Sequence, residues 1–188
     1  MMIWNLPNLL ALSRILMAPF MLYLMLNPEI ITDQGFHASW VNYFVGLIFV
    51  IASITDFFDG FIARQLDQKT DLGAILDPLA DKMLTLAAFF GLMMMGVASV
   101  WAIYIIIIRE LFISGLRTSA VQIGLDVSAS WAGKVKTVVQ MIAIGFLLMD
   151  WIFAQQLLWL AVLLTVYSGV EYLLAYAKGL KKLKVLQS

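Results

Sequence analysis

The chain has 188 residues, of which 63% are hydrophobic, and it carries 12 basic and 12 acidic side chains. Soluble domains are about 45–50% apolar and about 25% charged, so one water-soluble core could not cover this much apolar surface. The formal net charge of +0 gives no indication of a nucleic-acid partner, and the absence of cysteine excludes disulfides and thiolate metal sites. This composition indicates an all-α, polytopic membrane protein.

Six segments are long and apolar enough to cross a membrane as helices, which takes about 20 residues each. They are residues 6–26, 40–63, 77–97, 98–118, 131–150 and 153–177. The short connections favour a single membrane domain over residues 1–188, built as one six-helix bundle, with a tight turn near Gly96–Ser99. The first segment lacks a basic start and a small-residue cleavage site, so we expect a retained helix and no cleavable signal peptide.

Basic residues are distributed unevenly among the connections. If the N-terminus is inside, the outer connections are residues 27–39, 96–99 and 151–153, and these contain no Lys or Arg. Because Lys and Arg are enriched in cytoplasmic loops, we expect both termini in the cytoplasm and a multi-pass protein of the plasma membrane. The basic tail 178–188 is expected to be a solvated helix end, with attraction to anionic lipid as the alternative.

Four aspartates interrupt the apolar pattern where the second and third spans approach each other. Acids at membrane depth are costly and are therefore functional candidates. Residues three or four apart share a helix face, so Asp56 and Asp59 are neighbours in the second span. Asp77 and Asp81 are neighbours in the third, and the polar connection 65–73 lets the two pairs meet at the inner side.

Carboxylate oxygens are the ligands that Mg²⁺ and Mn²⁺ prefer. Four carboxylates can hold two such ions about 3.5–4 Å apart, the arrangement used for phosphoryl displacement. Small residues lie beside these acids, namely Gly60, Ala63 and Gly73. Such residues allow membrane helices to pack closely, or they leave a groove for a bulky substrate group, and next to four acids we favour the groove. The pattern predicts metal-assisted chemistry on a phosphate-bearing substrate.

The order Asp56-x2-Asp59-Gly60-x2-Ala63-Arg64-x8-Gly73-x3-Asp77-x3-Asp81 resembles the signature of the CDP-alcohol phosphatidyltransferases at every signature position. The stretches LPNLLALSR, IIIIRELFISGLR and GKVKT are similar to the bacterial phosphatidylglycerophosphate synthases within that family. The resemblance implies that an alcohol hydroxyl attacks the β-phosphorus of CDP-diacylglycerol and releases CMP. It also implies a homodimer embedded in membrane lipid.

The resemblance further implies roles for the matched residues. Two divalent cations, Mg²⁺ or Mn²⁺, would be bound by Asp56, Asp59, Asp77 and Asp81. Asp81 would also be the general base for the attacking hydroxyl. The residues implied for CDP-diacylglycerol are Gly60, Ala63, Arg64 and Gly73, with Asn8 as a further candidate. For Arg64 the alternative is that its side chain only extends to the membrane interface.

Basic residues around the fourth and fifth spans indicate which alcohol is the acceptor. They are Arg109, Arg117, Lys134 and Lys136. A pocket of Arg and Lys side chains binds phosphate, and sn-glycerol 3-phosphate supplies both a phosphate and a hydroxyl. The alternatives are that these residues only mark the cytoplasmic side, or that Arg109 pairs with Glu110. Residues two apart on a helix face away from each other, so both lysines reach one site only if the helix is irregular there or their stems bend.

Two other functions stay open on the sequence. A sibling enzyme of the same family would use serine, inositol phosphate or another lipid as the acceptor. A cation transporter would use the aspartates as its ion path, but acids in such a path should continue across the membrane. Here the acids gather at the inner end, so the distribution of charge favours the enzyme.

Overall fold

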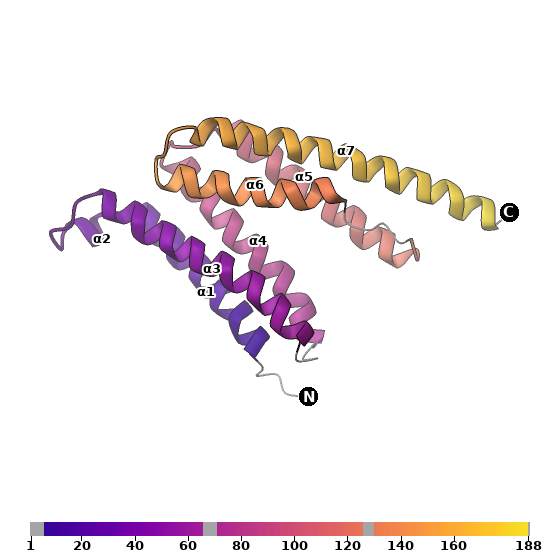
Figure 1. Ribbon diagram of the computed structural model, residues 1–188, viewed down its shortest axis with the longest axis horizontal. Coiled ribbons are helices and arrows are strands. Elements are labelled where there is room, and N and C mark those ends of the chain that lie inside the picture. Colours follow the sequence, from indigo (N-terminus) through magenta and orange to yellow (C-terminus); the bar gives the residue numbers. More distant parts are fainter. Residues whose placement is uncertain (1–5, 66–70, 126–129, 188) are drawn as a thin grey trace. The chain divides into compact units, whose positions relative to one another are not determined.

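The computed structural model describes residues 6–65, 71–125 and 130–187 (Figure 1). Over these ranges it contains seven helices and no strand. The helices are α1 (Leu6–Leu26), α2 (Glu29–Thr32), α3 (Ser39–Gln65), α4 (Asp71–Met94), α5 (Val100–Gln122), α6 (Trp131–Leu148) and α7 (Ala154–Gln187). The predicted all-α class is confirmed for this part of the chain.

The six long helices correspond in order to the six segments predicted to cross the membrane. By length and composition, three stretches of the described residues could span a bilayer, namely Asn8–Leu26, Trp131–Leu148 and Ala154–Leu183. α3 and α4 contribute the shorter apolar stretches Ser39–Thr55 and Lys82–Met94. α5 is interrupted by three charged residues, Arg109, Glu110 and Arg117. The chain is therefore a helical membrane protein, and the full count of six spans stays a prediction.

Most helix ends lie within four residues of the predicted span boundaries, and two lie further away. The tight turn expected near Gly96–Ser99 is present, because α4 ends at Met94 and Gly96 has a φ of 71°, a conformation that glycine adopts at little cost. α4 begins at Asp71, six residues before the predicted residue 77. α7 continues to Gln187, ten residues past the predicted end of the span at residue 177, so the described part of the basic tail is the end of this helix, as expected.

The chain forms two compact units. Unit 1 consists of Met1–Val97 and Ile144–Trp151, and unit 2 consists of Ala98–Ala143 and Ile152–Ser188. The division passes through α6, whose first part belongs to unit 2 and whose last turn belongs to unit 1.

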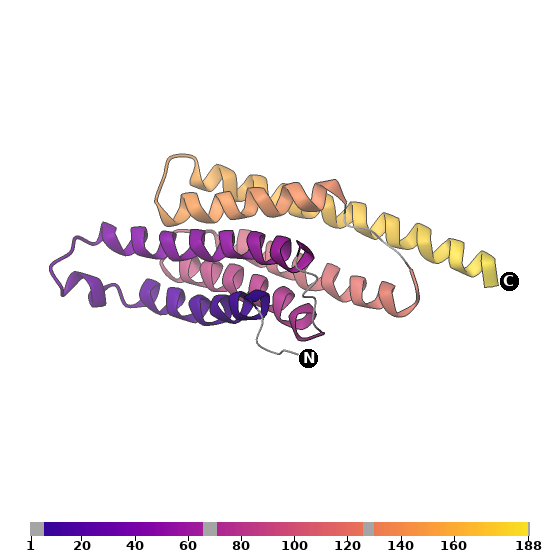
Figure 2. The same ribbon diagram turned by 60° about the horizontal axis from the view of Figure 1, so that its bottom comes forward.

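In unit 1, α1 packs along both α3 and α4 (Figures 1 and 2). The buried face of α1 repeats every three or four residues and comprises Ala11, Arg14, Ala18, Met21 and Met25. A Cβ atom added at Gly91 of α4 would overlap the side chain of Met25, so α1 and α4 approach closely, as small residues allow in membrane bundles. The starts of α1 and α4 and the end of α3 lie at the same end of this unit (Figure 2).

In unit 2, α5 and α7 pack against each other. The buried face of α7 has the same three-and-four spacing, with Leu158, Ala161, Thr165, Ser168 and Tyr172. This face is apolar in its first half and polar in its second half. The polar half therefore lies within the packed interior of unit 2, where polar groups need hydrogen-bond partners.

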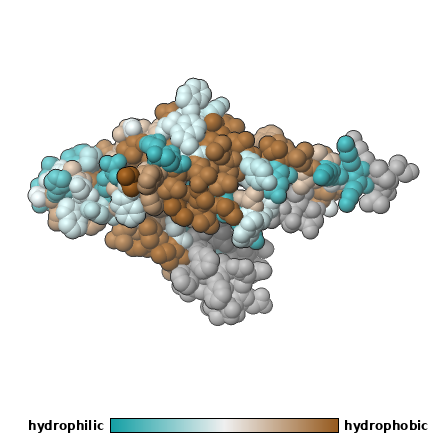
Figure 3. Space-filling view, turned by 45° about the horizontal axis from the view of Figure 1, so that its top comes forward, coloured by the Kyte–Doolittle hydropathy of each residue, from teal (hydrophilic) through white to brown (hydrophobic). Residues whose placement is uncertain are grey.

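Large hydrophobic side chains are widely exposed on both units. Leu163 is 66% exposed and Trp131 is 77% exposed, and Figure 3 shows a broad hydrophobic area on the face in view. Extended apolar surface of this kind is unfavourable in water and favourable in lipid. The outward-facing residues are therefore consistent with a bilayer as the solvent of this protein.

Candidate active site

The four predicted metal ligands lie on two adjacent helices of unit 1, and we call this region the acidic end. Asp56 and Asp59 are near the C-terminal end of α3, and Asp77 and Asp81 are in the N-terminal half of α4. α3 contacts α4, and the helix ends that carry the aspartates are neighbours in both ribbon views (Figures 1 and 2). The side chains of all four aspartates lie outside the described residues, so the arrangement of their carboxylates stays a prediction.

The donor set at the acidic end is chemically suited to a hard divalent cation. α3 and α4 each contribute two carboxylates, which are oxygen ligands of the kind that Mg²⁺ and Mn²⁺ bind. Among the side chains that the structure describes, no three His, Cys, Asp or Glu residues gather closely enough to hold a metal. The four aspartates remain the predicted ligands.

The residues implied for the nucleotide lie at the same end of unit 1. Gly60, Ala63 and Arg64 are in the last turns of α3, and Gly73 is in the first turn of α4, where it is buried. Asn8 is in the first turn of α1 and is 5% exposed. Ala63 and Arg64 have their backbone on α3, and their side chains lie outside the described residues.

Arg14 is a residue of this unit to which the sequence analysis assigned no role. It belongs to the buried face of α1 and has no exposed surface. A guanidinium that is wholly removed from water needs charged or polar partners, and Arg14 does take part in such an interaction. The signal for it in the sequence is a single arginine within an otherwise apolar span.

In unit 2, one carboxylate joins two of the predicted phosphate-binding cations. The Glu110 Oε1 atom accepts a hydrogen bond from Arg109 Nη1 at 3.2 Å, and it also accepts one from Lys136 Nζ. Arg109 and Glu110 are consecutive in α5, whereas Lys136 is on α6. We call Arg109, Glu110 and Lys136 the basic cluster. The pairing of Arg109 with Glu110, which was the alternative, is thus observed, and Lys136 donates to the same carboxylate oxygen.

α7 holds the other side of the Arg109 guanidinium. Arg109 Nη2 donates a hydrogen bond of 2.8 Å to Ser168 Oγ, and Ser168 Oγ donates in turn to the carbonyl oxygen of Thr165 at 3.2 Å. A Cβ atom added at Gly169 would lie 3.3 Å from both Cγ and Nε of Arg109. The Arg109 side chain therefore lies directly against the backbone of α7, at a position where that helix has no side chain.

The other two predicted cations have different surroundings. Arg117 is exposed on α5, with its guanidinium carbon 5.9 Å from the centre of the Tyr172 ring, which is within the range of a cation–π contact. Lys134 is exposed, whereas Lys136 is 4% exposed. The two lysines thus face different sides of α6, as their spacing predicts, and the described contacts bring together only Arg109 and Lys136.

Several polar residues of unit 2 were missed by the sequence analysis. On α7 these are Thr165, Ser168 and Tyr172, and on α6 there is Gln140, which is 5% exposed and follows Lys136 by one turn. Their signal in the sequence is a polar residue at every third or fourth position of an apolar helix, which marks one buried face. That periodicity identifies the face, but it does not identify which helix lies opposite.

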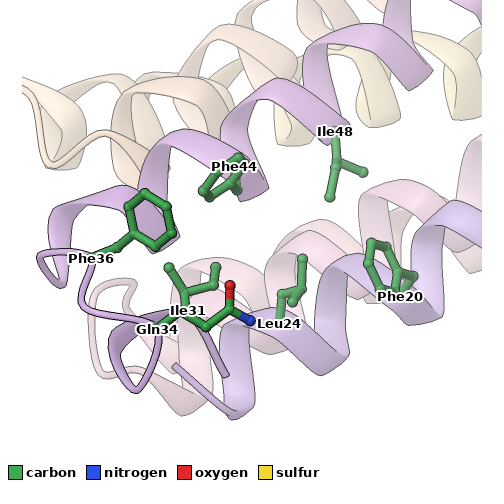
Figure 4. Close-up of a pocket in the computed structure, with 7 residues that line it drawn as sticks. All are labelled: Phe20, Leu24, Ile31, Gln34, Phe36, Phe44 and Ile48. Carbon is green, nitrogen blue, oxygen red and sulfur yellow. The ribbon is translucent and has the colours of Figure 1, made fainter. Parts of the chain in front are cut away.

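An apolar pocket of about 250 Å³ lies in unit 1, near the end of α1 and the start of α3 (Figure 4). Its lining residues are Phe20, Leu24, Ile31, Gln34, Phe36, Phe44 and Ile48. Figure 4 shows side chains of α3 and α1 pointing toward one another across it. It contains no charged group, and the acidic end lies toward the opposite ends of these two helices. Within unit 1, this pocket is therefore separate from the acidic end.

Comparison with known proteins places this helical membrane protein among the lipid-headgroup transferases. The model of the CDP-alcohol phosphatidyltransferase family matches residues 4–167, which include α1 to α6 and the first part of α7. The chain belongs to this family. The resemblance noted in the aspartate signature is thereby confirmed.

Curated relatives cover nearly the whole chain. A CDP-diacylglycerol–glycerol-3-phosphate 3-phosphatidyltransferase of Bacillus subtilis (strain 168) is 38% identical over an alignment of 192 positions, which covers 96% of this chain and 98% of the relative. The protein of the same name from Escherichia coli (strain K12) is 37% identical, covering 92% and 94%. A probable phosphatidylglycerophosphate synthase of Mycobacterium tuberculosis (strain ATCC 25618 / H37Rv) is 39% identical, covering 89% and 79%.

Proposed function

We propose that this protein transfers the phosphatidyl group of CDP-diacylglycerol to a hydroxyl of sn-glycerol 3-phosphate, which yields phosphatidylglycerophosphate and CMP. The observation that carries the proposal is the complete acidic signature on α3 and α4. It occurs in a chain that is 38% identical, over 96% of its length, to a relative named for this reaction. Sibling enzymes share the donor, so the choice of acceptor rests on these relatives and on the basic residues of unit 2.

The transfer moves one phosphorus between two oxygens. The acceptor hydroxyl oxygen forms a bond to the β-phosphorus of CDP-diacylglycerol, the bond from that phosphorus to the bridging oxygen breaks, and CMP leaves with that oxygen. Asp81 is the proposed base that takes the hydroxyl proton, which requires hydrogen-bond contact between the carboxylate and the hydroxyl. Asp56, Asp59 and Asp77 would hold two divalent cations together with Asp81. When bound, Mg²⁺ or Mn²⁺ neutralises charge on the diphosphate and on the leaving group.

The chemistry of the substrate supports a site at a membrane boundary. Its acyl chains stay in lipid while its diphosphate needs polar groups, and the acidic end combines the two environments at the ends of apolar helices. Gly60, Ala63 and Gly73 would leave room for the cytidine group, with Asn8 and Arg64 near the nucleotide. The charge asymmetry of the connections supports six spans with both termini and the site on the cytoplasmic side of the plasma membrane. A homodimer also remains a prediction.

The basic residues of unit 2 are the proposed site for the phosphate of the acceptor. Arg109 and Lys136 already converge on one anionic oxygen, that of Glu110. A phosphate oxygen accepts hydrogen bonds from the same donors. Arg117 and Lys134 would add positive charge from the exposed sides of α5 and α6.

An acceptor screen tests the proposal directly. Purified protein in detergent is supplied with CDP-diacylglycerol and Mg²⁺, and CMP release is measured with glycerol 3-phosphate, serine, inositol phosphate or no acceptor. We expect release with glycerol 3-phosphate, its loss with a chelator, and its return when Mg²⁺ or Mn²⁺ is added. Product formed only with serine would refute the assigned acceptor, and full activity in excess chelator would refute the proposed role of the aspartates.

A further inference from the structure

In the basic cluster, the carboxylate of Glu110 occupies the two cations that are proposed to bind the phosphate of the substrate. Side chains of Arg109 and Lys136 are 15% and 5% exposed, whereas that of Glu110 is 30% exposed. Cations that are this deeply buried need an anion close by, because an uncompensated buried charge is strongly destabilising. Glu110 supplies that anion from within unit 2.

A carboxylate and a phosphate compete for the same donors. Arg109 Nη1 and Lys136 Nζ both donate to Glu110 Oε1, and charged oxygens of either group accept such hydrogen bonds. Two anions held at the same pair of cations also repel each other. Binding of a phosphate to Arg109 and Lys136 is therefore favoured if Glu110 releases them.

The surrounding contacts indicate which of the three side chains moves. Arg109 is held from the other side by Ser168, which is 1% exposed, and by close contact with the backbone at Gly169. Lys136 is buried on α6. Glu110 is the most exposed of the three and has three rotatable bonds, so it can turn away while the two cations keep their places.

We propose that Glu110 is a positioning residue that acts as an internal counter-ion, holding Arg109 and Lys136 together until the phosphate of the acceptor takes its place. The identity of that acceptor as glycerol 3-phosphate rests on the proposed function. In this exchange the carboxylate preserves the arrangement of the two cations in the unloaded protein. It also lowers the apparent affinity for the acceptor, because part of the protein is always in the Glu110-paired state.

The variant Glu110→Gln tests the exchange in two ways. The amide has no charge and competes less well, so we expect the KM for glycerol 3-phosphate to fall about threefold to tenfold, with kcat changed less than twofold. We also expect the thermal midpoint of the unloaded variant to lie below that of the wild type. Adding inorganic phosphate, at ionic strength matched with chloride, should close that gap because the anion replaces the missing counter-ion.

Controls separate this role from a purely structural one. Glu171→Gln removes a carboxylate from an exposed position of α7 and should change neither the KM nor the response to phosphate. Glu110→Asp keeps the charge on a shorter side chain. It therefore serves as the second variant if Glu110→Gln does not fold, and it should lower the KM by a smaller factor. An unchanged or raised KM in both Glu110 variants, or a loss of stability that phosphate does not repair, would overturn the exchange.

Failure of this proposal is distinguishable from failure of the proposed function. If the wild type releases no CMP with glycerol 3-phosphate, the acceptor assignment is wrong, and the stability measurement with inorganic phosphate still tests Glu110. If the wild type is active and the variants show neither effect, only the counter-ion role of Glu110 is wrong.

Discussion

The acidic end of unit 1 and the basic cluster of unit 2 are both groups of charges in an apolar protein, but they are built differently. The four aspartates lie between residues 56 and 81, on two helices that follow each other in the chain. The basic cluster joins α5 to α6, and Ser168 of α7 extends it through a contact 59 residues along the chain from Arg109. The proposed site for chemistry is thus encoded locally, whereas the proposed site for recognition depends on three helices that must first fold together.

This contrast predicts that the two regions affect different kinetic constants. Changes at the acidic end should act on kcat, because they remove groups that are proposed to take part in the transfer. Changes in the basic cluster should act mainly on the KM for the acceptor. The following variants separate the two, from the largest expected effect to the smallest.

Asp81→Asn should have the largest effect. The amide cannot take the proton of the acceptor hydroxyl, so we expect kcat to fall on the order of 10²- to 10⁴-fold, the range typical of general-base catalysis. The measurement is CMP release at saturating substrates, with membrane insertion and thermal midpoint compared with those of the wild type. Asp33→Asn, at an exposed position following α2, is the matched control and should keep full activity. Near-normal turnover of the Asp81 variant would remove Asp81 from catalysis.

The two lysines of α6 should differ, although both were predicted to bind phosphate. Lys136→Met removes a buried donor, and a hydrogen bond to a charged group contributes about 1.5–3 kcal/mol, so the KM for glycerol 3-phosphate should rise roughly 10- to 100-fold. Lys134→Met changes an exposed side chain, and its effect should be roughly fivefold or less. Equal effects would show that both lysines reach the phosphate and that the face of α6 does not decide their role.

Gly169→Ala should have the smallest effect that is still measurable. Its Cβ would lie 3.3 Å from Cγ and Nε of Arg109, so the arginine must shift by a few tenths of an ångström. We expect the KM for the acceptor to rise roughly twofold to fivefold. Gly115→Ala, on α5 with no neighbour within 4 Å of the added atom, is the control. Identical KM values for the two variants would show that the approach of Arg109 to α7 is unimportant for binding.

Sequence reasoning succeeded where the information is local. The length of the apolar run predicted α1 over residues 6–26 as observed, and the turn at Gly96 followed from the need to end one helix and begin another within a few residues. The aspartate pairs could be placed on neighbouring helix ends because only a short polar connection separates them. These features depend on residues that are close in the chain.

The contacts of the basic cluster could not be predicted in the same way. Spacing alone indicated that Lys134 and Lys136 face different sides of α6, but not which of them is buried. The partnership of Arg109 with Ser168 depends on how α5 packs against α7, which no local pattern determines. The basic tail, by contrast, was expected to be the end of a helix, and α7 does continue to Gln187, because lysine and leucine are good helix formers and a change to basic composition does not end a helix.

The uninterrupted course of α7 has a mechanical consequence. Its 34 residues extend about 51 Å at about 1.5 Å per residue, whereas the hydrocarbon layer is about 30 Å thick. A tilt of about 20° shortens the projection only slightly, so a membrane-spanning α7 extends beyond the hydrocarbon layer, and its basic final turns are expected to project into the aqueous phase as a stiff rod. A reporter domain joined at the C-terminus would then be held at a fixed height above the lipid headgroups, and its distance from the bilayer would measure the tilt of this helix.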